Sequence, residues 1–441
     1  MIQTPDAPDA SAAVPPGRTS LPVPAPVTAA GLPALRRRVQ AVLIATQILG
    51  GLGIAIGVAL AAVLAAEVGG TEALAGLAST ATVTGPALLA MPLATLMAAR
   101  GRRAGLVLAY LLGALGAGVV VLGAVTDSFA LLLTGLVGFG AGSSANLAAR
   151  FAAADLAEPD RRARAISTVV WATTVGAVLG PNIAAPAGRS VAGLGVPAAA
   201  GPFVWAAGVF VVAAAVVALA LRPDPLLTAR ALAGAEPGTE PGEAAEGRSL
   251  RAGMRAVRES PRARLALVTV AGSHTAMVSI MSMTPVALTH HGADIRLIGL
   301  VISGHIAGMY AFSPLMGWLS DRLGRLSVIG LAVGLIGTAA LVAGTAGPSH
   351  GRIALGLFVL GLGWSAGLVS GSALLTDSVP QAARAAVQGL SDFVMNTAAA
   401  VGGLAAGLIV SRAGYGPLNA IAACLLLPMA ALALRGTFRK A

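Results

Sequence analysis

Long apolar runs alternate with short polar connections along the whole chain, and the pattern repeats twelve times. Each run holds about the 20 residues that a helix needs to cross a hydrocarbon layer of roughly 30 Å. The runs cover approximately 39–66, 73–98, 105–125, 129–154, 164–188, 201–221, 264–289, 296–316, 326–345, 353–375, 386–411 and 416–435. The pattern therefore predicts an all-α polytopic membrane protein with twelve transmembrane helices.

The composition agrees with this fold class. The mean hydropathy is +0.84, charged residues make up 11% of the 441 residues, and 57 glycines are spread through the apolar runs. A soluble domain of this length cannot bury so much apolar surface, and a membrane barrel would need short alternating segments instead. The single cysteine, Cys424, excludes a disulfide framework and a thiolate metal cluster.

The net charge of +11 could suggest nucleic acid, but the arginines cluster in short loops between the apolar runs. Topology explains them better, because cytoplasmic loops of membrane proteins carry the excess of positive charge. A cytoplasmic N-terminus puts the larger group on that side, namely Arg100, Arg102, Arg103, Arg161, Arg162, Arg164, Arg322, Arg325, Arg384, Arg435, Arg439 and Lys440. Only Arg189, Arg296, Arg352 and Arg412 fall on the opposite side. We expect a multi-pass protein of the cytoplasmic membrane with both termini in the cytoplasm.

One long polar connection divides the chain into two halves. We expect a disordered tail over 1–35, a first six-helix bundle over 36–221, a cytoplasmic linker over 222–263, a second bundle over 264–435 and a short tail over 436–441. The linker is acidic and contains Gly and Pro before an arginine-rich stretch begins, which predicts a flexible segment leading into a surface-lying amphipathic helix. The basic cluster directly before the first apolar run argues against a cleaved signal peptide.

The loop after the eighth apolar run reads Gly317-Trp-Leu-Ser-Asp321-Arg322-Leu-Gly324-Arg325. Gly324 permits a tight turn, and Gly317 lets another helix approach closely. In its place within a twelve-run chain, this motif resembles the loop signature of the major facilitator superfamily (MFS). The resemblance covers about residues 36–435 and implies two pseudo-symmetric six-helix bundles, alternating access without enzymatic activity, and similarity to bacterial drug and metabolite exporters.

The two halves also resemble each other in sequence. Gly101-Arg102 recurs as Gly324-Arg325 at an offset of 223, Asp155 recurs as Asp377 at 222, and Arg164 recurs as Arg384 at 220. One approximate spacing fits parallel repeats. The first copy departs from the family motif, because Ala98 stands where the family has its Asp. The gating role of that Asp is thus carried over to Asp321 alone, which pseudo-symmetry places near Arg161–Ile166.

The fifth run contains Gly176-x-x-x-Gly180-Pro181, which resembles the antiporter signature of the superfamily. Gly-x-x-x-Gly allows two helices to pack closely, and Pro181 bends the helix. Close packing here could seal the cavity against leak, as exchange requires. The alternative is ordinary helix packing in a chain rich in glycine.

Charges within a bilayer are costly and mark functional positions. Asp392 is the clearest, and Gln388 and Asn396 lie one turn to either side on the same face of the eleventh helix. A carboxyl flanked by amides in a partly dry cavity could exchange a proton near neutral pH. The alternative is a structural acceptor that ties two helices together.

Two intramembrane histidines are further candidates for proton coupling. His274 lies in the middle of the seventh run and His305 about midway along the eighth. Histidine titrates near neutral pH, so either could relay a proton. The alternative is a neutral imidazole bonded to a backbone carbonyl. His290-His291 makes a poor metal site, because adjacent residues point to different sides of a helix, and we expect no metal.

The fourth run, which lines the cavity in this superfamily, carries Asn146 and Arg150 one turn apart. Arg150 could attract an anionic substrate, pair with Asp392 or Asp155, or extend to the cytoplasmic surface. Gln47, Trp171, Tyr310 and Trp364 complete the plausible lining. Aromatic groups beside few charges favour an amphipathic or apolar organic solute over a sugar.

The sequence contains no G-x-x-x-x-G-K-[ST] phosphate loop and no nucleophile elbow, so we expect no cofactor and no enzymatic chemistry. Transport must then run on an ion gradient or on the gradient of the solute itself. We predict a monomeric secondary transporter for a small molecule, with proton-coupled efflux as the first expectation. A metabolite symporter or facilitator, and a non-transporting receptor on the same fold, remain alternatives.

Overall fold

The computed structural model describes residues 31–70, 75–234 and 250–438. Most of the predicted N-terminal tail, the acidic part of the linker and the last three residues lie outside these ranges. The described residues contain 12 helical segments long and apolar enough to span a membrane, as predicted. Glycines let these helices approach closely: a Cβ added at Gly116 would lie 2.0 Å from the backbone nitrogen of Phe139.

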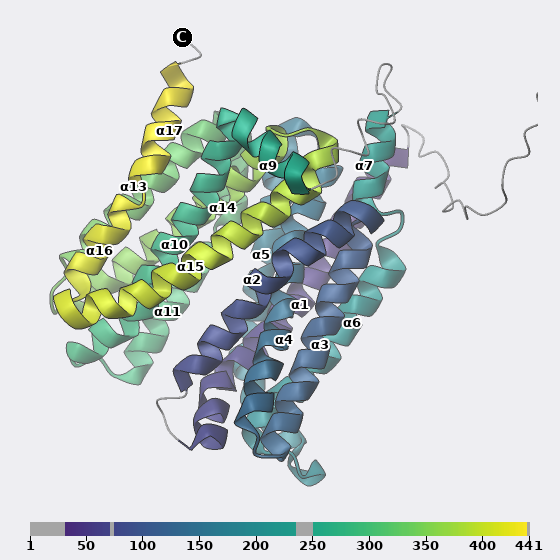
Figure 1. Cartoon of the computed structure of the whole chain (residues 1–441). Coiled ribbons are helices and arrows are strands. Elements are labelled where there is room, and N and C mark those ends of the chain that lie inside the picture. The colour runs from purple at the N-terminus through teal and green to yellow at the C-terminus, as the bar shows by residue number, and fades with distance from the viewer. Residues whose placement is uncertain (1–30, 71–74, 235–249, 439–441) are drawn as a thin grey trace, which may run out of the picture.

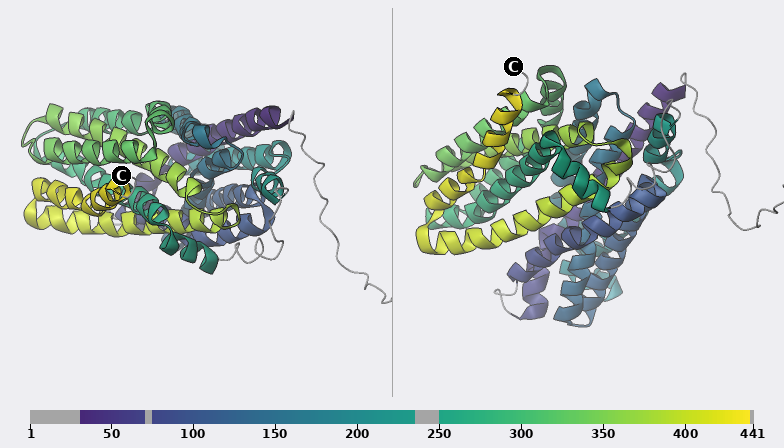
Figure 2. Two further views of the ribbon diagram at one scale, coloured as in Figure 1. Left: turned by 90° about the horizontal axis from the view of Figure 1, so that it is seen from above. Right: turned by 45° about the horizontal axis from the view of Figure 1, so that its top comes forward.

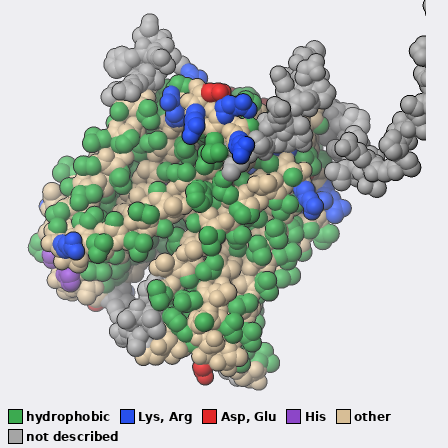
Figure 3. All heavy atoms as spheres, in the orientation of Figure 1, with side chains coloured by type: hydrophobic (Ala, Val, Ile, Leu, Met, Phe, Trp, Pro, Cys, Tyr) green, Lys and Arg blue, Asp and Glu red, His purple; other side chains and the backbone are tan. Residues whose placement is uncertain are grey.

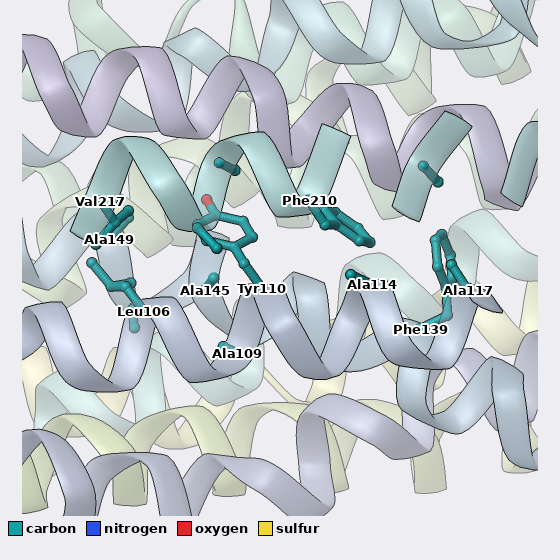
Figure 4. Packing of buried hydrophobic residues seen from close by; sticks show 14 of the residues in the cluster. Leu106, Ala109, Tyr110, Ala114, Ala117, Phe139, Ala145, Ala149, Phe210 and Val217 are labelled. Atoms are coloured by element: carbon teal, nitrogen blue, oxygen red, sulfur yellow. The ribbon is translucent and has the colours of Figure 1, made fainter. Parts of the chain in front are cut away.

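The first half consists of six long helices. They are α1 (Leu32–Gly69), α2 (Ala75–Arg100), α3 (Arg102–Val125), α4 (Phe129–Asp155), α5 (Arg162–Ser190) and α6 (Gly201–Ala220). Aromatic rings fill the space between α3, α4 and α6 (Figure 4). Phe139 packs edge-on against Phe203 with the ring centres 5.2 Å apart, and Phe210 bridges Phe139 and Tyr110.

The second half also spans the membrane six times. Its helices are α10 (Pro261–His290), α11 (Ile295–Tyr310), α12 (Ser313–Leu323), α13 (Arg325–Gly344), α14 (His350–Asp377), α15 (Arg384–Ala413), α16 (Tyr415–Cys424) and α17 (Leu427–Phe438). Two predicted single helices are each broken in two. The eighth span is interrupted between α11 and α12, where Pro314 lacks the N–H that a continuous helix requires. The twelfth breaks between α16 and α17, just before Pro428.

The linker contains more helix than predicted. Residues 222–263 include α7 (Pro225–Gly234) and α9 (Leu250–Glu259). Helix α9 is the amphipathic helix expected from the sequence, with Val257 in a core cluster shared with α10 and α15. Helix α7 was not predicted, because its ten residues carry no distinct apolar period. It begins with Pro225 at a position where the missing N–H costs nothing.

The two halves lie side by side and meet closely at one end only (Figures 1 and 2). This end carries α7, α9, the start of α1 and the end of α17, and we call it the arginine-rich end because arginine side chains gather over it (Figure 3). From there the two sets of helices diverge toward the opposite end, which we call the far end. The halves contact each other mainly through α2 with α15 and through α5 with α12.

Candidate functional site

An ion pair joins the two halves inside the bundle. The Arg150 guanidinium on α4 donates to the Asp392 carboxylate on α15 at 2.6 Å, and its Nε donates to the Ser372 hydroxyl on α14 at 3.2 Å. The Arg150 side chain is 1% exposed and the Asp392 side chain 11%. Arg150 therefore does not extend to the membrane surface, and of the predicted alternatives the structure contains the pair with Asp392.

The polar face predicted for α15 lies at this interface. Gln388 is hydrogen-bonded to Arg102 of the first half and donates to the Thr376 hydroxyl at 3.4 Å. Asn396 donates to the backbone carbonyl of Asp392 at 2.7 Å. A cavity of about 20 Å³, room for roughly one water molecule, touches both Asp392 and Arg102. The face thus forms a buried polar seam between the halves.

Asp321 occupies the place predicted for it by pseudo-symmetry. Its carboxylate accepts hydrogen bonds from the backbone N–H groups of Ala163 and Arg164 at 3.2 and 2.9 Å. These are free N–H groups of the first turn of α5, where the helix dipole favours an anion. Arg325 donates to the same carboxylate at 2.6 Å, which holds it in position. Asp321 thereby joins α12 to the start of α5 in the other half.

The repeats noticed in the sequence correspond to matching ion pairs. Arg102 pairs with Asp155 at 2.7 Å in the first half, and Arg325 pairs with Asp377 at 3.2 Å in the second. The preceding glycines, Gly101 and Gly324, have φ values of +88° and +90°, which side-chain-bearing residues rarely adopt. Arg162 adds an ion pair to Asp377 across the halves.

The position of the missing acid in the first half is filled by the linker. Ala98 packs with Leu226 of α7 and Ala385 of α15. Arg230 of α7 donates to the Ala98 carbonyl at 2.6 Å, and Asp224 accepts from the Arg103 N–H at 2.7 Å. Arg384, which corresponds to Arg164 in the repeat, has a buried Nε with no hydrogen-bond partner among the described residues. Because the first half has no acid at this position, the Nε of Arg384 lacks a hydrogen-bond partner among the described residues, and α7 covers the space next to Ala98.

The aromatic candidates of the second half form one cluster. The Trp364 indole donates to His274 Nδ1 at 2.9 Å, and the Tyr310 ring meets Trp364 edge-on with the centres 5.5 Å apart. Trp364 lies on α14, two turns before the Ser372 that Arg150 contacts. The cluster therefore lies along the helix that bears one contact of the central ion pair.

His305 is placed differently from His274. Its Nδ1 lies 2.7 Å from the Leu357 carbonyl, and the side chain is fully buried between α11 and α14. This is the backbone-bonded arrangement that the sequence analysis gave as its alternative. We therefore leave His305 out of the proton-coupling group.

Two candidates of the first half lie in its interior. Gln47 on α1 donates to the Thr173 hydroxyl on α5 at 2.8 Å and keeps a buried carbonyl oxygen without a partner among the described residues. Asn146 accepts from the Tyr110 hydroxyl at 3.1 Å. Asn146 lies one turn before Arg150 on α4, whereas the polar contact of Gln47 stays within the first half, so the role of both in holding a solute stays a prediction.

Trp171 does not join this group. Thr173, Gly176 and Gly180 turn one side of α5 toward α1, while Ala163 and Ser167 turn an adjoining side toward the second half. At 100° per residue, Trp171 lies on the side of α5 opposite α1, one turn after Ser167 and beside the contact with the second half. Its side chain is 40% exposed, and its place in the cavity lining stays a prediction.

The Gly176-x-x-x-Gly180 motif packs against α1. A Cβ added at Gly176 would lie 2.3 Å from the Leu52 backbone nitrogen, and one added at Gly180 would lie 2.4 Å from the Ala55 Cβ. Pro181 continues α5 without ending it. The close packing that the motif predicts is present, whereas the exchange activity that it suggests remains a prediction.

Several residues of the interface were missed from the sequence. Ser372 follows Arg150 by 222 residues, the offset of the Asp155 and Asp377 repeat, so an alignment of the halves would have pointed to it. Arg162 was read only as a topological charge. Asp224 lies in a linker whose contacts had no sequence signal.

Solved membrane transporters share this fold. The human organic anion transporter MFSD10 (TETRAN) aligns with a TM-score of 0.70 at 19% identity, over 90% of this chain and 99% of that one. The transporter FucP in its outward conformation aligns with a TM-score of 0.66 at 17% identity, over 89% and 98% of the two chains. The fold and its paired halves therefore define the class: a polytopic helical membrane protein built from two six-span halves.

The family follows from the sequence comparisons. The Major Facilitator Superfamily profile matches residues 42–294 and 265–440. An uncharacterized MFS-type transporter of Bacillus subtilis, YdeG, is 38% identical over 89% of this chain and 90% of its own length. The riboflavin transporter RfnT of Brucella anthropi is 30% identical over 79% and 82%. The chain belongs to the Major Facilitator Superfamily.

Proposed function

We propose that the protein exports a small organic solute across the cytoplasmic membrane in exchange for protons, with its arginine-rich end in the cytoplasm. The excess of arginine at that end supports this orientation, because positive loops stay inside. In this orientation both termini are cytoplasmic. With this orientation, the contacts between the halves lie toward the cytoplasm and the helices diverge toward the outside, which supports an outward-facing state.

The Arg150–Asp392 pair carries the proposal. Removing the charge of one partner from a buried pair leaves the other uncompensated, which is strongly unfavourable. A proton arriving at Asp392 from outside therefore weakens the contact between α4 and α15. The cytoplasmic end is then free to open, and the proton leaves into the less acidic cytoplasm. The cytoplasmic end closes again only when Asp392 has lost its proton and the charged pair has re-formed. A solute bound during this closing step is carried outward.

Flux in proteoliposomes tests the direction and the coupling. Acidifying the outside should speed solute extrusion by an antiporter, whereas a symporter would accumulate the solute. Asp392→Asn should abolish proton-driven flux, because an amide cannot exchange the proton. Asp294→Asn is the matched control: Asp294 is exposed and caps α11, which Asn does equally well. Full proton-driven flux in Asp392→Asn contradicts the proposal, and no flux for a broad solute panel favours a receptor.

A second candidate function is transport of a planar aromatic metabolite. The similarity to a riboflavin transporter favours it, together with the His274, Tyr310 and Trp364 cluster, whose rings could stack on a flat heterocycle. Riboflavin fluorescence should then be quenched on binding, and Trp364→Leu should remove the quenching while Trp318→Leu, an exposed residue of α12, leaves it. Unchanged riboflavin fluorescence at saturating protein excludes this substrate.

A further inference from the structure

A basic groove lies at the arginine-rich end of the first half, outside the interface between the halves. It has a volume of about 530 Å³ and runs between the start of α1, the end of α4 and the start of α5. Its lining contains four arginines and one acid: Arg36, Arg37, Arg161, Arg164 and Glu158. The lining of the groove therefore has an excess of three positive charges.

The acid in the groove does not neutralise these arginines. Arg36 is used structurally, since it donates to the Leu156 carbonyl at 2.7 Å and pairs with Glu158. Arg161 is 66% exposed and reaches Glu158 only at 3.6 Å. Arg164 contacts Asp321 at 3.4 Å, and Arg37 is exposed. Arg37 and Arg161 can therefore turn toward a ligand without breaking the fold.

The groove opens on the side of the molecule that faces lipid. Arg164, Trp171 and Val178 follow one another every seven residues along α5, and all three are at least 40% exposed. This exposed stripe lies on the side of α5 opposite α1, beside the contact of Arg164 with Asp321, so in a membrane Arg164 meets headgroups and the rest of the stripe meets acyl chains. The lining beneath the arginines is mostly apolar and includes Val39, Leu156 and Ala165. The site is thus cationic at the membrane surface and apolar toward the bilayer.

We propose that this groove binds the headgroup of an anionic phospholipid. The phosphate is held by Arg37 and Arg161, whose planar guanidinium groups match phosphate oxygens in a two-pronged contact. One acyl chain lies below it along the seam between α1 and α5, past Thr168. A soluble phosphate would use the arginines alone, whereas the apolar lower part of the groove fits a lipid.

The test measures lipid retention by the purified full-length protein with native mass spectrometry, in mixed phosphatidylglycerol and phosphatidylcholine. Arg37→Gln/Arg161→Gln should reduce the affinity for phosphatidylglycerol about 30-fold, at the energy expected for two surface arginines. The control Arg38→Gln/Arg100→Gln removes two exposed arginines from the same end but outside the groove, and should change the affinity less than two-fold. Arg37→Lys/Arg161→Lys should retain part of the binding.

Three results would overturn the assignment. Equal losses in the groove and control variants would reduce the effect to general surface charge. Equal retention of phosphatidylglycerol and phosphatidylcholine would remove the preference for an anion. Protection against thermal unfolding by soluble glycerol phosphate as strong as that by the lipid would make the occupant a soluble anion. Because none of these readouts involves transport, their failure is separate from failure of proton-coupled export.

Discussion

Arg150 and Asp392 come from different halves, and burial makes each depend on the other. A fully buried charge keeps its place only while its partner and its hydrogen bonds remain. Ser372 supplies one of these bonds from a third helix, α14. The contacts among these three residues therefore exist only while the two halves are in contact at this position.

Replacing one partner should cost more than replacing both. We expect Arg150→Ala to lower the stability of the closed arginine-rich end by about 3 kcal/mol, because Asp392 is left without its cation. The double variant Arg150→Ala/Asp392→Ala should recover most of this stability but not transport. Thermal unfolding of Arg150→Ala, Asp392→Ala and the double variant in detergent measures the effect. A simple sum of the two single losses would show that the pair is not coupled.

Asp321 offers a second test at the level of one residue. Asp321→Ala should leave the protein inserted but slow transport several-fold, because the N-terminus of α5 loses its anion and Arg325 loses its partner. Asp321→Asn keeps one acceptor oxygen, so its transport rate should lie between those of the unmodified protein and Asp321→Ala. Initial rates of solute flux at equal amounts of protein provide the measurement. Rates equal to those of the unmodified protein would remove Asp321 from the gate.

The sequence predicted the residues of the site better than their partners. The spacing of Gln388, Asp392 and Asn396 was enough to put them on one face, and pseudo-symmetry was enough to locate Asp321. The sequence could not fix the surroundings of Trp171, because an aromatic residue within a membrane helix can face lipid or the interior equally well. Ser372 and Asp224 were missed because a hydroxyl in an apolar run and an acid in a linker gain meaning only from tertiary contacts.

Among the elements, α1 and α5 pack through glycines, and this contact can be tested without touching a charge. Gly176→Ala places a methyl group 2.3 Å from the Leu52 backbone nitrogen and should destabilise the protein by about 1–3 kcal/mol through overpacking. Gly118→Ala on α3 is the control, because no atom lies within 4 Å of the added carbon. Melting temperatures of both variants measure the two losses of stability, and that of Gly176→Ala should be the larger. An equal effect at both positions would mean that the α1–α5 contact has no special tightness.

Helix α7 is the element that the sequence did not predict, and Asp224 holds it. Its carboxylate accepts from the Leu226 and Leu227 N–H groups at the start of α7 and from the Arg103 N–H of α3. Asp224→Ala should release α7, at a cost of about 1 kcal/mol typical of a lost helix cap. Hydrogen exchange over residues 225–234 should then rise, and it should stay unchanged in the exposed control Asp160→Ala. Unaltered protection in Asp224→Ala would mean that Leu226 and Arg230 alone hold the helix.

At the scale of the whole molecule, hydropathy and repeats were sufficient for the class, the number of spans and the division into halves. They could not predict which end of the bundle is closed, because the same contacts between helices can form in more than one state of a rocking protein. The breaks in the eighth and twelfth spans also escaped, since Pro314 and Pro428 are compatible with a continuous bent helix. Which end is closed became clear only in the structure, from the position of the ion pairs between the halves and from the divergence of their helices.

The central claim is that the two halves rock and that the Arg150–Asp392 pair holds the arginine-rich end closed. Pulsed electron–electron double resonance, which measures the distance between two spin labels, tests this claim directly in lipid. With Cys424 replaced by Ser, one pair of labels is placed at the exposed positions Ala99 and Leu323 near the arginine-rich end. A second pair is placed at the exposed positions Thr126 and Ser411 near the far end. At acidic pH the first distance should lengthen and the second shorten, and Asp392→Asn should produce the same change at neutral pH. If both distances stay the same under acid and in Asp392→Asn, the pair does not govern the motion and the account is contradicted.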